Sequence, residues 1–159
     1  MEKKSHLDKK LARLAAVQAI FQAHHRQQTL MGVMKEFEQH DFSMVLDALA
    51  VSNLSQAFFK TLLVGLDQKI HEINEIITRH LSDDWTFERI DSVSRAILQV
   101  GLYELLYHPE TPAIVVISEY SDMAHAFFDA SDASFVNGLL NRVARSARPN
   151  DFDLLPENG

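Results

Sequence analysis

Apolar residues recur every three or four positions along almost the whole chain, and this spacing constrains the fold more than any other feature. In the first segment Leu7, Leu11, Leu14 and Phe21 form one stripe, which predicts a helix over about 6–28. An all-β protein needs frequent turns, but the 159 residues include only five glycines and four prolines. The pattern therefore predicts an all-α fold, a compact bundle of about six or seven helices.

The same spacing continues beyond the first helix. Asn53 is a good N-cap, and Gln56 stands where it would complete a capping box. The long helix that follows is expected to kink or split near Gly65 or Asp67. In chain order, the pattern predicts further helices over about 30–39, 53–80, 88–107, 112–128 and 133–147.

The segment 88–107 is apolar on nearly every side, which is typical of a helix at the centre of a fold. Leu98 lies on this helix and is expected in the core. A single polar strip of Asp91, Arg95 and Gln99 is expected to face solvent. Thr111-Pro112 then indicates an N-cap followed by proline at the first position of the next helix.

Charge is unevenly distributed along the chain, whose net charge is −7. Residues 1–28 hold six lysines and arginines against two acids, whereas residues 29–141 hold six against seventeen. Residues 142–159 hold three arginines followed by three acids. Both ends of the chain could therefore face a polyanion, while the acidic middle faces water or a basic protein.

Composition and motifs argue against several functions. There is no cysteine, which excludes thiolate chemistry and fits a reducing, cytoplasmic location. Neither a glycine-rich phosphate loop nor an HExxH motif occurs, and the eight histidines share no spacing, so we expect no enzyme activity, cofactor or metal. The longest apolar stretches, such as residues 113–117, are too short to span a membrane.

One candidate binding surface lies on the first predicted helix. His6, Lys9, Lys10 and Arg13 are spaced i, i+3, i+4 and i+7, so they line one face. Cations that converge on one strip can neutralise several phosphates. The alternative is that this basic start is ordinary solvated surface.

A second candidate lies at the start of the last predicted helix. Ser131, Ser134, Phe135 and Asn137 combine hydroxyls, backbone amides and an aromatic ring, which suit phosphate contacts and base stacking. The spacing alone favours the alternative in which the serines cap the helix and Phe135 lies in the core. Asn137 could then either hydrogen-bond RNA or cap the helix.

Three segments in their order and spacing resemble the NusB family of transcription antitermination factors. They are RIDSVSRAILQVGLYELLY, the proline-started PAIVVISEYSDMAHAFF, and FVNGLLNRVAR. The opening KKLARLAAVQAIFQ is also similar to that family's first helix, so the resemblance spans about residues 8–148. It implies one domain over 1–159, built from two packed three-helix subdomains at roughly 6–80 and 85–148, with a frayed tail at 149–159.

The resemblance also implies a function without catalysis. Members of the family bind the boxA segment of nascent ribosomal or phage RNA together with the ribosomal protein NusE. That complex helps RNA polymerase read through terminators. The oligomeric state stays open between a monomer and a homodimer, in which part of the RNA or NusE surface would be covered.

Part of the implied RNA site lies on the first helix. The family's arginine-rich start falls on Lys9, Lys10 and Arg13, with Leu11 in place of another basic residue. Phe21 stands where the family often has tyrosine, so it can stack but cannot donate a hydrogen bond.

The rest of the implied site surrounds the last helix. Phe135 and Asn137 are retained, while Ser134 replaces a common lysine. Ser131 and Ser94 stand where the family carries acidic residues. These departures predict a recognisable but weaker RNA site.

Two alternatives remain from the sequence. The same module resembles the N-terminal domain of a bacterial 5-methylcytosine RNA methyltransferase, although no cysteine is present to act as its nucleophile. The second alternative is a helical scaffold that binds protein alone, which the weakened basic strip would suit.

Overall fold

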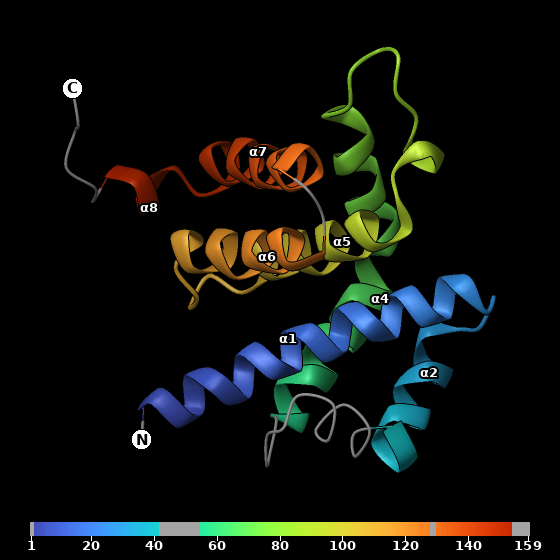
Figure 1. Ribbon diagram of the computed structural model, residues 1–159. Helices are drawn as coiled ribbons and strands as arrows, with labels where there is room; N and C mark the ends of the chain where they lie inside the picture. The colour runs from blue at the N-terminus through green and yellow to red at the C-terminus, as the bar shows by residue number, and fades with distance from the viewer. Residues whose placement is uncertain (1, 42–54, 128–129, 154–159) are drawn as a thin grey trace. The chain divides into compact units, whose positions relative to one another are not determined.

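A computed structural model describes residues 2–41, 55–127 and 130–153. Across these three ranges the chain forms seven α-helices, one π-helix and one 3-10 helix, and no strand (Figure 1). The predicted all-α fold is therefore confirmed. None of the helices described combines the length and apolar character that crossing a membrane requires.

Contacts divide the chain into two compact units, Met1–Lys69 and Ile70–Gly159. Unit 1 contains α1 (Glu2–His25), α2 (Leu30–Glu36), the π-helix η1 (Phe37–Asp41) and the first part of α4 (Gln56–Arg79). Within it, the rings of Phe37 and Phe59 stack with centroids 5.7 Å apart. Four buried alanines give α1 a smooth face that lets neighbouring side chains approach closely: Ala12, Ala15, Ala16 and Ala19.

The turn between α1 and α2 is built from backbone and cap hydrogen bonds. Gln27 has a φ of 55°, the left-handed conformation that commonly ends helices. The next residue, Gln28, donates its N–H to the carbonyl of Ala23 at 2.9 Å, as in a Schellman motif. Thr29 then caps α2, since its hydroxyl accepts from the N–H of Gly32 at 3.1 Å. The first helix therefore ends slightly earlier than the predicted residue 28.

The start of α4 differs from the prediction. Asn53, the predicted N-cap, lies outside the described residues. At the helix start, the hydroxyl of Ser55 accepts from the N–H of Phe58 at 3.2 Å, the geometry of a serine cap. The helix is uninterrupted as far as Arg79, so the split considered near Gly65 does not occur.

Unit 2 holds the rest of α4 and a packed set of three long helices (Figure 1). Leu98 is fully buried, which confirms the predicted central helix. A Cβ built on Gly101 would lie 3.1 Å from the ring of Tyr120, so glycine allows this close approach. The elements of unit 2 are η2 (Phe87–Arg89), α5 (Ser92–Tyr107), α6 (Ala113–Phe127), α7 (Ala130–Ala147) and α8 (Pro149–Asp153).

The polar strip of α5 does not face solvent, which corrects the prediction for two of its three residues. Arg95 and Gln99 are only 7% and 8% exposed. The Arg95 guanidinium lies 5.3 Å from the Phe87 ring centroid, and Gln99 donates to the side-chain oxygen of Asn74 at 2.9 Å. Only Asp91 is exposed, and it is the N-cap of α5. The strip therefore ties α5 to other elements of unit 2.

Part of the predicted frayed tail is helical. Residues 149–153 form α8 rather than a frayed tail, while the residues after them lie outside the description. The Asp151 carboxylate accepts from the N–H of Ala113 at 2.8 Å and pairs with Arg148 at 2.7 Å. Arg148 also donates to the carbonyl of Thr111 at 2.7 Å. The Asp151 carboxylate thus caps the start of α6. This helix begins at Ala113, one residue later than the predicted Pro112.

Candidate nucleic-acid interface

The basic strip on α1 contains both exposed and buried cations. Lys9 and Lys10 are exposed, whereas Arg13 is only 2% exposed. The side chain of His6 lies outside the described residues, although its backbone is helical. Two members of the strip therefore present positive charge at the surface, and Arg13 is packed inside.

Phe58 of α4 lies under this strip within unit 1. The Lys9 ammonium is 5.4 Å and the Arg13 guanidinium 5.2 Å from its ring centroid, within the range of cation–π attraction. The N–H of Ser55 also donates to the carbonyl of Asp8 at 3.1 Å, which ties the start of α4 to α1. The spacing on α1 predicted the strip but gave no sign of the aromatic ring.

Phe21 lies further along α1 and is half-buried. Its ring stacks on that of His25, with centroids 5.7 Å apart and planes 6° from parallel. One face of the ring therefore already has an aromatic neighbour from its own helix.

Asn137 lies in the interior of α7, because that helix begins at Ala130 rather than at the predicted 133. The alternative that Asn137 caps the helix is therefore wrong. Its amide donates to the hydroxyl of Ser121 on α6 at 2.9 Å, and its side-chain oxygen accepts from Asn141 at 3.1 Å. Asn137 thus links two helices of unit 2.

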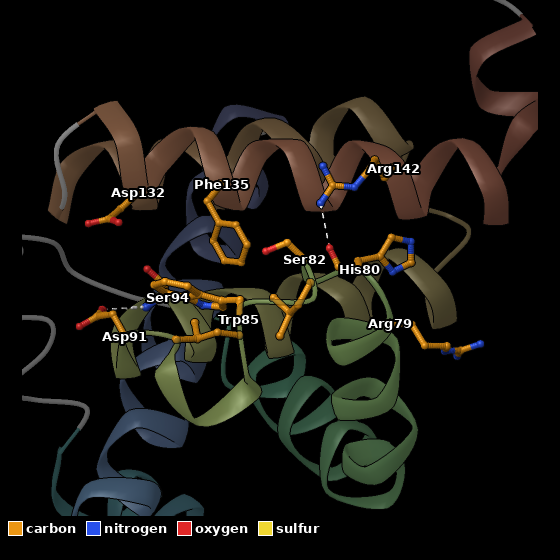
Figure 2. Close-up of a pocket in the computed structure, with 11 residues that line it drawn as sticks. Arg79, His80, Ser82, Trp85, Asp91, Ser94, Asp132, Phe135 and Arg142 are labelled. Carbon is orange, nitrogen blue, oxygen red and sulfur yellow. Dashed lines mark hydrogen bonds between the residues drawn. The ribbon is translucent and has the colours of Figure 1, made fainter.

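The structure brings Ser94 and Phe135 together in one cavity of about 820 Å³ in unit 2 (Figure 2). Ser94 is buried, Phe135 is half-buried, and Ser134 is exposed on α7. The side chain of Ser131 lies outside the described residues. The other residues lining the cavity are Arg79, His80, Leu81, Ser82, Trp85, Ile90, Asp91, Asp132 and Arg142.

Sequence reasoning missed Trp85 and Arg142 as neighbours of Phe135. Trp85 is 46% exposed although it is a large aromatic side chain, and it follows the turn after α4. The one available signal was the chain's single tryptophan placed in a polar turn. Arg142 lies two turns after Phe135 on α7, so its i+7 spacing placed it on the same face.

The ten predicted site residues divide between the two units. His6, Lys9, Lys10, Arg13 and Phe21 belong to unit 1. Ser94, Ser131, Ser134, Phe135 and Asn137 belong to unit 2. Among the residues that the structure describes, no three histidine or acidic side chains gather as a metal site would require.

The fold and these surfaces define the class: an all-α protein with exposed lysines on one helix and an aromatic-lined cavity. A family model described as the NusB family matches residues 10–145. The chain belongs to the NusB family. The family comprises antitermination factors rather than enzymes, which confirms the expectation of a non-catalytic protein.

Curated relatives carry the name transcription antitermination protein NusB. The relative from Maricaulis maris (strain MCS10) is 38% identical over 144 residues, covering 91% of this chain and 90% of its own length. The relative from Novosphingobium aromaticivorans is 39% identical over 137 residues, covering 86% and 93%. Both matches are to antitermination proteins and not to RNA methyltransferases.

Solved structures give the same result for the fold. T. maritima NusB superposes with a TM-score of 0.75 at 27% identity, covering 92% of this chain and 97% of that one. A structure of antitermination factors NusB and NusE in complex with dsRNA matches with a TM-score of 0.68 at 25% identity, covering 86% and 96%.

Proposed function

We propose that this protein is a transcription antitermination factor that binds boxA-type single-stranded RNA of nascent transcripts together with ribosomal protein NusE. Its role is to promote read-through by RNA polymerase, chiefly in ribosomal RNA operons. One observation carries the proposal: the solved NusB–NusE complex with dsRNA contains a chain of the same fold that matches 86% of this one.

The exposed cations of α1 support an RNA surface on unit 1. Lys9 and Lys10 lie next to each other in sequence and are both exposed, so both can approach a phosphate backbone. Arg13 supports the surface indirectly, by packing on Phe58 beneath Lys9. This surface carries fewer accessible cations than the sequence pattern predicted. We therefore expect it to bind RNA weakly by itself and to need a partner protein for tight binding.

The acidic middle of the chain supports NusE as that partner. Residues 29–141 carry a net charge of −11, which repels a polyanion at long range. The same charge attracts a basic ribosomal protein and speeds its docking. Bound NusE would then add its own cations to the lysines of α1.

The assembly forms in the cytoplasm, where nascent transcripts and ribosomal proteins meet. It acts there as part of an RNA polymerase antitermination complex.

A homodimer would cover part of the RNA or NusE surface and so serve as a storage form. Sedimentation of the protein alone and with NusE tests this, because the storage form should dissociate when NusE binds.

A gel-shift with boxA RNA tests the proposed function. RNA should shift weakly with the protein alone and strongly when NusE is added, and a scrambled RNA of the same composition should shift less. Binding of NusE without any shift of boxA RNA would favour the protein-only scaffold. Absence of both interactions would overturn the proposed function.

A further inference from the structure

One guanidinium is enclosed by the turn between α5 and α6 in unit 2. It belongs to Arg148, which follows α7 and whose side chain is only 10% exposed. Its Nη2 donates to the carbonyls of Thr111 at 2.7 Å and Pro109 at 3.1 Å. Its Nη1 donates to the carbonyl of Leu105 at 3.4 Å. These three backbone oxygens, from the end of α5 and the turn after it, form a carbonyl cradle around one cation.

The chemistry of the carbonyl cradle fits a guanidinium better than any other side-chain group. A guanidinium is a planar cation with five N–H donors and no acceptor, so it can bond several carbonyls at once. The carbonyls in the last turn of a helix have no partner within the helix and attract positive charge. A lysine ammonium is a compact point charge and does not provide the same planar set of donors.

The α8 segment supplies a carboxylate beside the carbonyl cradle. The Asp151 carboxylate pairs with the Arg148 guanidinium at 2.7 Å, and the same oxygen accepts from the N–H of Ala113 at 2.8 Å. The end of α5 therefore receives a cation and the start of α6 an anion, which are the favourable charges at those two helix ends. A pair of residues three positions apart thus holds both sides of one turn.

The same segment is attached to α7 by its backbone and by one aromatic contact. The N–H of Arg148 donates to the carbonyl of Ala144 at 2.7 Å, and the N–H of Asp151 donates to the carbonyl of Arg148 at 3.1 Å. The Arg145 guanidinium lies 4.6 Å from the ring centroid of Phe152. In Figure 1, α8 follows α7 and lies at the end of unit 2 where α5 turns into α6.

A helix as short as α8 is not stable by itself, so its order depends on these attachments. Removal of the Arg148 guanidinium would take the donor away from all three carbonyls of the cradle. It would also leave the Asp151 carboxylate without the cation that holds it beside Ala113. The short helix and the start of α6 should therefore open together, as one local unit.

We propose that residues 148–153 form a strap that one guanidinium holds closed over the α5–α6 turn. The carbonyl cradle is a guanidinium-binding site that the chain fills with its own Arg148. When the site is filled, the strap is closed and Asp151 caps α6. When the site is empty, the strap opens and α6 loses its cap. This device lies outside the proposed RNA surface and does not depend on the proposed function.

The first experiment measures hydrogen exchange at single amides by NMR. The first N–H groups of a helix have no acceptor within the helix, so exchange at Ala113 reports directly on its bond to Asp151. Arg148→Ala should accelerate this exchange about 5- to 30-fold. Exchange at Tyr120, in the interior of α6, should stay as in the parent. Arg26→Ala removes an exposed arginine from unit 1 and is the matched control, with no change expected at Ala113.

The second experiment fills the empty site with free guanidinium. About 50 mM guanidinium chloride, far below the molar concentrations that unfold proteins, should restore slow exchange at Ala113 in Arg148→Ala. The same concentration of sodium chloride should not restore it, and the parent should respond to neither salt. Arg148→Lys should exchange as fast as Arg148→Ala, because an ammonium does not fit the carbonyl cradle. Asp151→Ala should also exchange fast, but guanidinium should not rescue it, since the acceptor for Ala113 is gone.

Each result bears on one part of the proposal. Unchanged exchange at Ala113 in Arg148→Ala would overturn the strap. Fast exchange that guanidinium restores no better than sodium does would overturn the guanidinium site. Equal acceleration at Ala113 and Tyr120 in both Arg148→Ala and Arg148→Lys would show that unit 2 opens as a whole, which would overturn a separate strap. Rescue by guanidinium in Arg148→Ala, and not in Asp151→Ala, is the result that the proposal predicts.

Discussion

The guanidinium of Arg13 lies 5.2 Å from the ring centroid of Phe58, and Arg13 is only 2% exposed. The arginine of the basic strip is therefore part of the packing of α1 on α4 in unit 1. Lys9 lies over the same ring at 5.4 Å but remains exposed. One aromatic side chain thus contacts two cations of the strip, and only one of them is accessible.

Arg13→Ala should lower the free energy of unfolding by about 1–3 kcal/mol, because it removes a buried cation–π contact and the packing of a long side chain. Urea denaturation measures this change. Lys10→Ala is the control from the same strip and should change stability by less than about 0.5 kcal/mol, since Lys10 is exposed. Equal effects of the two substitutions would contradict the structural role of Arg13.

Replacing both Lys9 and Lys10 with alanine should flatten the plot of log RNA affinity against log salt by about 1.4, since each phosphate contact to single-stranded RNA contributes roughly 0.7. If Arg13 also contacted a phosphate, replacing all three cations would flatten the slope by about 2. RNA binding with NusE present, measured at several salt concentrations, gives the slope. Lys35 and Lys60, also exposed, provide a charge-matched double-alanine control that should keep the parent slope. If the two double variants give the same slope, the RNA does not lie on the α1 lysines.

Leu98→Ala should cost about 2–5 kcal/mol, because the side chain is fully buried on the central helix and its removal leaves a cavity. Gln99→Ala should cost about 1 kcal/mol through loss of its hydrogen bond to Asn74. Ser118→Ala, on the exposed side of α6, is the appropriate control and should be near neutral. Thermal unfolding compares the three, and a Leu98→Ala protein that melts with the parent would rule out the central placement of α5.

Gln27→Gly should stabilise the protein by about 0.5–1 kcal/mol. The left-handed φ of 55° strains a residue with a Cβ, and relief of that strain exceeds the added chain entropy of glycine. Gln28→Gly is the adjacent control and should not stabilise, because Gln28 does not have a positive φ. A melting temperature for Gln27→Gly at or below that of the parent would contradict this explanation of the turn.

The helices were predictable because the spacing of apolar residues reports directly on which face is buried. The burial of polar residues was not predictable from this spacing. Gln99 looked like solvent-facing surface, yet its partner Asn74 lies 25 positions away, a pairing that only tertiary structure specifies. Asp151 likewise caps a helix that begins 38 residues earlier in the chain, which no local pattern indicates.

Only part of the candidate site was predictable, because residue spacing shows which side chains share a helix face but not how deeply they are buried. The spacing identified the strip on α1 but not the depth of Arg13, since burial depends on Phe58 from another helix. The cavity beside Phe135 also includes Trp85, Arg79 and Arg142, which come from three separate segments. The role of each predicted residue in RNA binding stays a prediction.

An RNA titration at one fixed salt concentration, with and without saturating NusE, tests the composite RNA-binding surface most directly. NusE should tighten boxA RNA binding roughly 5- to 150-fold, which corresponds to a coupling of about 1–3 kcal/mol. By reciprocity, RNA should tighten NusE binding by the same factor. Equal RNA affinity with and without NusE would contradict a composite surface formed by the two proteins.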